Sequence, residues 1–102
     1  QAKKFGVRAP MVGHMGDGNF HVVLPYDPKK KEMYKQLRAF NDTLIRKALE
    51  LNGTITGEHG VGLHKKEYLL EQHPDNIPVM KSIKRTIDPN NIMNPGKIFD
   101  LN

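Results

Sequence analysis

Two histidines stand close together in a glycine-rich segment, GHMGDGNFH, at residues 13–21. The Asp17-Gly18 pair is a strong signal for a two-residue hairpin turn, which would place His14 opposite His21. Directly opposed residues project to the same face with Cβ atoms about 5 Å apart. Two imidazoles at that separation can share one metal ion. The alternative is a hairpin whose histidines are only hydrogen-bonded, but the surrounding glycines, which let backbone approach a ligand closely, favour the metal.

A third ligand is expected from the segment GEHG at residues 57–60, which offers a carboxylate and an imidazole between glycines. Neighbouring residues at the end of a strand point in opposite directions, so we expect Glu58 and His59 to have different roles. One would bind the metal and the other would face the substrate. A His/His/Glu set with open positions suits zinc or manganese. The alternative is a solvated loop carboxylate beside a turn histidine.

Other residues of these types are assigned simpler roles. His64 and His73 lie in sequence that predicts helix, where a surface or capping histidine is expected. Met80 and Met93 are expected in the core rather than at a cofactor. The segment NPGK at residues 94–97 predicts a turn with exposed backbone N–H groups, and the residues alone favour simple chain termination there.

The elements that must position these residues follow from periodicity and turn signals. The pattern predicts strands over 6–12, 19–25 and 54–57, and helices over 30–51, 63–73 and 75–87. The expected fold class is therefore α+β, with a small antiparallel sheet and helices packed on one face.

The long helix has the clearest pattern. Its apolar residues recur at steps of three and four, namely Met33, Leu37, Phe40, Leu44, Ala48 and Leu51. Asp27-Pro28 reads as the helix start, because Asp caps the first N–H groups and Pro fits the first helical position. Gly53, after Asn52, is expected to end the helix in the left-handed conformation.

Composition limits the class of protein. The chain has 102 residues with a net charge of +5, 37% hydrophobic and 26% charged residues, and no cysteine. We expect a single globular domain over residues 1–102, without disulfides, Cys-ligated zinc or iron–sulfur clusters. The basic residues are spread and not interleaved with aromatics, so nucleic acid is disfavoured and a small anionic ligand is favoured. The start QAKKFGVRAP, without Met or signal peptide, predicts a piece of a longer protein.

Three segments in this order, GHMGDGNFH, TGEHGVG and DPNNIMNPGKIF, resemble the C-terminal domain of FAD-linked oxidases. These are the vanillyl-alcohol-oxidase-like flavoproteins, which include the glycolate oxidase flavin subunit, D-lactate dehydrogenases and D-2-hydroxyglutarate dehydrogenase. The resemblance extends from about Phe5 to Leu101. It implies a larger enzyme whose N-terminal portion holds most of the FAD, so the isolated chain is expected to be inactive.

The resemblance also implies site residues. The metal-dependent members bind zinc or a similar divalent ion at the positions of His14, His21 and Glu58. The adjacent histidine, His59, corresponds to the base near the substrate hydroxyl. Asn94 corresponds to the asparagine near the flavin and substrate.

The function implied is oxidation of a 2-hydroxy acid to the 2-oxo acid with hydride transfer to FAD. Where the hydroxyglutarate enzymes carry a substrate-binding asparagine, this chain has Val23, which favours glycolate or D-lactate. The expected partners are that small acid, the flavin-binding domain of the same chain and other oxidase subunits. The expected location is cytoplasmic, with membrane attachment only through partner subunits and no transmembrane segment. The alternatives from other classes are a stand-alone metal-binding or metallohydrolase module and a non-catalytic basic binding domain.

Overall fold

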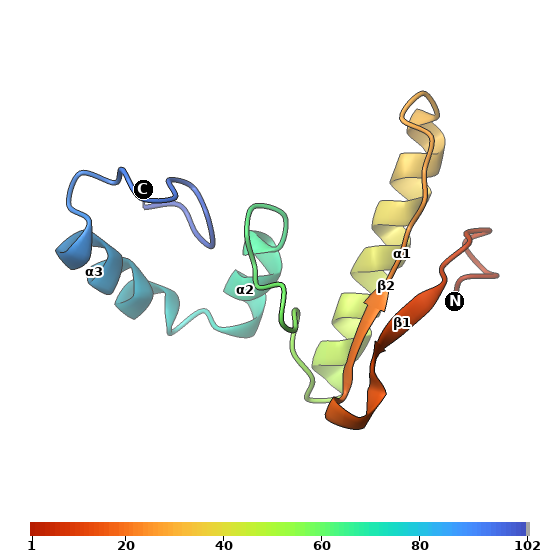
Figure 1. The fold of residues 1–102 in the computed structure, drawn as a ribbon, viewed down its shortest axis with the longest axis horizontal. Coiled ribbons are helices and arrows are strands. Elements are labelled where there is room, and N and C mark those ends of the chain that lie inside the picture. Colours follow the sequence, from red (N-terminus) through yellow and green to blue (C-terminus); the bar gives the residue numbers. More distant parts are fainter. Residues whose placement is uncertain (102) are drawn as a thin grey trace. The chain divides into compact units, whose positions relative to one another are not determined.

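The computed structural model describes residues 1–101, and the chain divides into two compact units. The first unit, Gln1–Gly53, contains β1 (Met11–His14), a 3₁₀ turn η1 (Met15–Asp17), β2 (Asn19–Val22) and α1 (Lys31–Glu50). The second unit begins at Thr54 and contains α2 (Lys66–Gln72) and α3 (Ile77–Ile87) (Figure 1).

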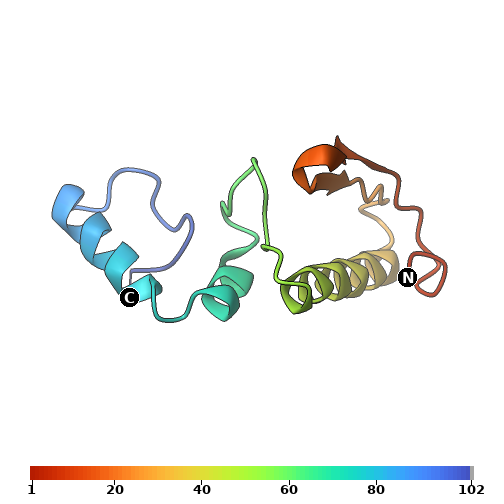
Figure 2. The same ribbon diagram turned by 90° about the horizontal axis from the view of Figure 1, so that it is seen from below.

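The strands β1 and β2 form an antiparallel hairpin in which His14 lies opposite Asn19 and Val12 opposite His21. The predicted two-residue turn, with His14 opposite His21, is therefore wrong. The connection is instead the helical turn η1, visible at the hairpin tip in Figure 2. Gly18 closes it at φ 70° and donates its N–H to the Met15 carbonyl at 3.1 Å. Glycines adopt such angles at little cost, so the Gly-Asp-Gly sequence accommodates this longer turn.

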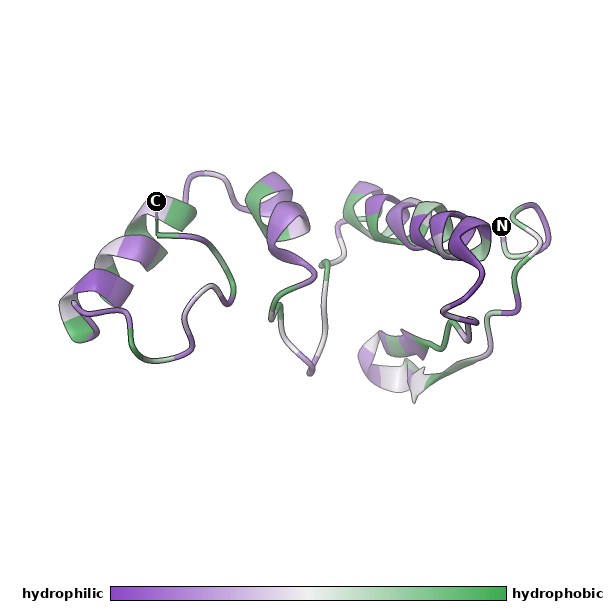
Figure 3. Ribbon diagram, turned by 90° about the horizontal axis from the view of Figure 1, so that it is seen from above, coloured by the Kyte–Doolittle hydropathy of each residue, from purple (hydrophilic) through white to green (hydrophobic). Residues whose placement is uncertain are grey.

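The helix α1 confirms the periodicity of the sequence, within one residue of the predicted limits at each end. Its residues Leu37, Phe40 and Ile45 are buried, and the Phe40 ring lies 5.9 Å from that of Phe5 in the N-terminal segment. Hydrophilic and hydrophobic residues alternate along it in Figure 3. The helix runs in the direction opposite to that of β2 (Figure 1). With 20 residues, it is the longest element of the first unit.

The ends of α1 differ from the prediction in detail. Asp27 Oδ1 accepts a hydrogen bond from Lys29 N at 3.0 Å, and the helix begins at Lys31, after this turn. At the other end Asn52, and not Gly53, takes the left-handed conformation, with φ 60°. Asparagine tolerates this region better than most residues. Gly53 has a different role, because a Cβ there would lie 2.9 Å from the Ala48 carbonyl oxygen.

The second unit is built around buried residues of α2, α3 and the segment before them, namely Ile55, Tyr68, Leu69 and Ile77. The predicted strand over 54–57 is wrong, since these residues form no strand. The side chain of Gln72 takes the place of a strand partner. Its Oε1 accepts hydrogen bonds from Ile55 N at 3.2 Å and Thr54 Oγ1 at 3.1 Å. The segment leading to the GEHG turn is thus attached to α2.

In the described part of the chain, residues 1–101, a two-stranded antiparallel sheet and three α-helices confirm the α+β class. The predicted helix over 63–73 is shorter than expected, because residues 62–64 form a turn before α2. The helix α3 carries Pro78 near its start, as predicted. Within residues 1–101, the helices lack the combination of length and apolar character needed to span a membrane.

Candidate active site

The hairpin places His14 and His21 on the same face, although they are not directly opposed. Val12 pairs with His21 and precedes His14 by two residues. Side chains of opposed residues, and of residues two apart in a strand, share one face. The two histidines are therefore diagonal neighbours, a relation that leaves long side chains within reach of each other. His14 is exposed and His21 is half-buried.

Gly13 allows the strands to approach closely beside His14. A Cβ at this position would lie 2.5 Å from both the Asn19 carbonyl oxygen and the Phe20 Cα. Both atoms belong to the backbone of β2 and cannot rotate away. A larger residue here would push the strands apart and change the spacing of the two histidines.

The second predicted group occupies a turn, with a hydrogen bond from Gly60 N to the Gly57 carbonyl at 3.2 Å. Because no strand forms here, the expectation that neighbouring side chains point in opposite directions fails. His59 Nε2 lies 3.6 Å from Glu58 Oε1. Their side chains are 71% and 51% exposed, so both can reach a ligand.

Two residues that sequence reasoning missed support this turn. Thr56 Oγ1 donates to the Gly60 carbonyl at 2.7 Å and accepts from Lys65 Nζ at 2.7 Å. Partial burial lowers the pKa of the Lys65 ammonium below its usual value. The two bonds tie both ends of the turn to the residue that precedes α2. No spacing rule indicates such a contact, although Thr56 directly precedes the turn.

The third motif belongs to the second unit as well. Its loop after α3 contains Asn91, Asn94 and Ile98 at positive φ, with values of 50°, 48° and 69°. Ile98 N donates to the Gly62 carbonyl at 2.8 Å. A few residues further along each segment, Lys66 and Asp100 form an ion pair of 2.8 Å. The structure therefore joins the second and third motifs directly, and Asn94 is exposed on the loop.

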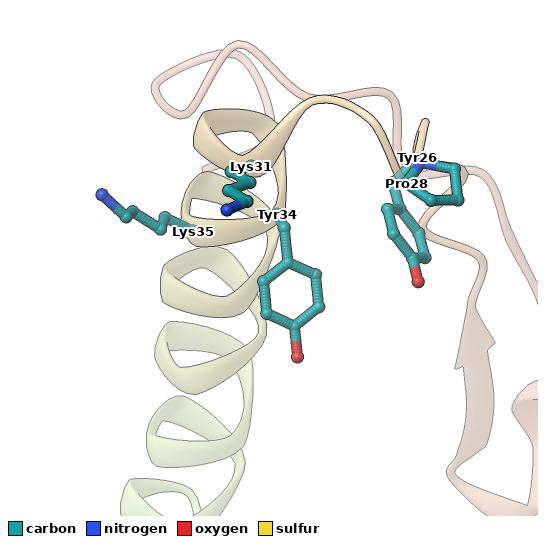
Figure 4. A pocket seen from close by; sticks show the side chains of 5 residues that line it. All are labelled: Tyr26, Pro28, Lys31, Tyr34 and Lys35. Carbon is teal, nitrogen blue, oxygen red and sulfur yellow. The ribbon is translucent and has the colours of Figure 1, made fainter.

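A separate hollow of about 410 Å³ lies at the start of α1, at the end of the first unit away from the η1 turn (Figures 1 and 4). It is lined by Tyr26, Pro28, Lys31, Tyr34 and Lys35. The two tyrosine rings lie 5.7 Å apart at 53°. This surface is aromatic and cationic, and sequence reasoning missed it because Tyr26 and Tyr34 belong to no recognised motif.

A known protein family matches nearly the whole chain, including the first two motifs and most of the third. The family model of the C-terminal domain of FAD-linked oxidases matches residues 1–98. The chain belongs to this family.

The names of several relatives of this FAD-linked oxidase domain describe related activities. It is 45% identical over 96 residues to a probable mitochondrial D-lactate dehydrogenase of Danio rerio, covering 93% of this chain and 19% of the relative. It is 41% identical to the glycolate oxidase subunit GlcD of Bacillus subtilis, covering 96% and 21%. It is 42% identical to a D-2-hydroxyglutarate dehydrogenase of Stutzerimonas stutzeri, covering 85% and 19%. The chain thus spans about a fifth of the length of these relatives.

Family membership confirms the resemblance drawn from the sequence and favours the flavoprotein class over both alternatives. Within this FAD-linked oxidase domain, the predicted site residues fall into two groups. His14 and His21 share a hairpin face in the first unit. Glu58, His59 and Asn94 lie in hydrogen-bonded turns of the second unit. Their assembly into one site belongs to the proposal below.

Proposed function

We propose that this chain is the C-terminal part of an FAD-dependent enzyme that oxidises a small 2-hydroxy acid, D-lactate or glycolate, to the 2-oxo acid. The family match carries the proposal, and the names of the three relatives above all describe enzymes that act on 2-hydroxy acids. The domain's own contribution would be a divalent metal site and a proton acceptor. A cytoplasmic location and contacts with other oxidase subunits stay predictions.

The donor set fits a divalent metal ion. We assign His14, His21 and Glu58 as ligands, two imidazoles from one hairpin face and one carboxylate from an exposed turn. Such an N₂O set with open positions suits zinc or manganese. The bound ion would polarise the substrate's carboxylate and 2-hydroxyl as a Lewis acid, while FAD would accept the hydride.

His59 is proposed as the base. Imidazole gains and loses protons near neutral pH, so it suits removal of the proton from the substrate's 2-hydroxyl oxygen. Its position next to Glu58 would bring it to the metal-bound end of the substrate. The Asn94 side-chain amide would hydrogen-bond at the flavin and the substrate, from a loop joined to the same unit.

Val23 bears on the choice of substrate. Its N–H donates to the Pro10 carbonyl at 3.0 Å, which continues the hairpin ladder beyond β2. Val23 follows His21 by two residues and so lies on the face of the two histidines. Its side chain is 51% exposed and offers only apolar atoms. A second carboxylate on the substrate would find no hydrogen-bond donor there, which supports a monocarboxylate.

Replacing Val23 with asparagine in the full-length protein is expected to shift specificity toward D-2-hydroxyglutarate. The amide would donate to the second carboxylate, and we expect the ratio of kcat/KM for hydroxyglutarate to that for D-lactate to rise about tenfold. Steady-state kinetics with both acids measures this ratio. The same change at Val22, on the opposite face, serves as the control. An equal shift for both variants, or none for V23N, would contradict the role of Val23.

The proposed function itself is tested on the purified full-length protein. We expect the absorption spectrum of bound flavin, bleaching of that spectrum on addition of D-lactate or glycolate, and formation of the 2-oxo acid as a dye is reduced. A protein without flavin, or flavin that neither acid reduces, would refute the proposal.

A further inference from the structure

Asp88 is the one buried polar or charged side chain among the described residues, with 5% exposure. It follows the last residue of α3, where the chain enters the loop that carries Asn94. Burying a carboxylate is unfavourable unless it is paired and hydrogen-bonded. Its partners therefore show what this buried group holds in place.

The partners of Asp88 lie directly before Asn94. Asp88 Oδ1 accepts a hydrogen bond from Ile92 N at 3.0 Å, and Oδ2 accepts one from Met93 N at 2.9 Å. Oδ2 also accepts from the Lys84 ammonium, which donates in addition to the Met93 carbonyl. The Asp88–Lys84 pair thus holds both the N–H and the C=O of Met93.

This fixes the backbone that enters Asn94. The Met93 carbonyl belongs to the planar peptide that joins Met93 to Asn94. Asn94 itself adopts φ 48°, a sparsely populated conformation for a residue other than glycine. Fixing the preceding peptide plane while the next residue is left-handed sets the direction in which the Asn94 side chain leaves the loop.

Apolar packing does little to hold the backbone that leads into Asn94. The side chains of Ile92 and Met93 are 77% and 59% exposed, so hydrophobic burial holds the segment only weakly. The hydrogen bond from Lys84 keeps the pKa of the Asp88 carboxyl below its usual value, so Asp88 is a carboxylate at neutral pH. We propose that Asp88, with Lys84, is a positioning residue that orients the Asn94 amide at the active site. The inference rests on the role of Asn94 in the proposed function.

The test uses Asp88→Asn and Asn94→Ala, singly and together, in the full-length flavoprotein. The carboxamide of D88N keeps one acceptor oxygen and replaces the other with an N–H₂ donor, so either the Ile92 bond or the contacts of Oδ2 must be lost. We expect D88N to lower kcat about tenfold or more with KM changed less than about twofold, because misplaced groups cost rate chiefly in the chemical step. The flavin absorption spectrum should shift in D88N in the same direction as in N94A.

The double variant separates positioning from general stability. If Asp88 acts through Asn94, D88N in the N94A background should change kcat by less than about twofold. Assays run well below each variant's unfolding temperature, with Asp75→Asn, an exposed aspartate before α3, as the control. Additive effects, or a D88N enzyme with unchanged kcat and spectrum, would overturn the positioning role and leave the proposed function standing. An N94A enzyme with parent kcat and spectrum would overturn both the positioning role and the role of Asn94.

Discussion

The His14→Ala variant of the full-length protein is expected to lose turnover and to bind less metal. His14 supplies one of three proposed ligands, and its side chain points from the same hairpin face as that of His21. Even changes around metal ligands cost about 10–100-fold in affinity or activity, so loss of a ligand should exceed about 100-fold in kcat/KM. Elemental analysis of the purified variant, alongside kinetics with D-lactate and glycolate, measures both effects.

His73→Ala is the matched control for this experiment. His73 directly follows α2, and its backbone N–H donates to the Leu69 carbonyl at 2.9 Å, a bond that alanine retains. The His73→Ala variant should keep the metal content and the activity of the parent enzyme. Retention of both metal and activity in H14A would rule out His14 as a ligand. Removing the metal from the parent enzyme with a chelator should give the kinetics of H14A. Added zinc or manganese should then restore activity to the chelated parent enzyme but not to H14A.

The His59→Gln variant is expected to lose turnover while keeping its metal. Glutamine can still hydrogen-bond, but it cannot take up the proton of the substrate hydroxyl. General acid–base catalysis contributes about 10²–10⁴-fold, and we expect kcat to fall by an amount in this range. Glu58→Gln, one residue earlier, should instead lower metal content and activity together. Metal analysis combined with single-turnover flavin reduction distinguishes the two neighbours.

The contrast between these neighbours is what makes the experiment decisive. Their side chains approach within 3.6 Å, so the geometry of the turn does not by itself assign the two roles. A His59→Gln enzyme that loses its metal would make His59 a ligand rather than the base. A Glu58→Gln enzyme with full metal content would remove Glu58 from the ligand set.

The hairpin illustrates how far the sequence leads. Turn residues identified the hairpin, but η1 replaces the two-residue turn expected at Asp17-Gly18. As a result, the residue opposite His14 is Asn19 and not His21. The shared face of the histidines survives because the partner of His14 changed by two residues, and side chains alternate with a period of two. A shift by one residue would have separated them.

The helices were predictable for a different reason. A periodic apolar stripe over many residues, as in α1, specifies its own structure. The short segment 54–57 lacks that redundancy, and its β-branched residues predicted a strand whose partner no local pattern supplies. The Gln72 side chain holds Ile55 instead, a contact between residues 17 apart. The hydrogen bonds of Asp88 were equally hidden, because Asp88 directly follows the predicted helix over 75–87 and no local pattern indicates its partners.

The attachment of the last motif to Gly62 and Lys66, just after the GEHG turn, has a consequence for synthesis on the ribosome. Lys66 and Asp100, which lie 34 residues apart, form an ion pair close to the bond from Ile98 N to the Gly62 carbonyl. Closing a loop of that length costs about 3 kcal/mol of chain entropy. The turn bearing Glu58 and His59 is synthesised well before residues 98–100. The contacts of residues 98 and 100 with Gly62 and Lys66 can form only after translation has passed residue 100, whereas the bonds of this turn to Thr56 and Lys65 can form earlier.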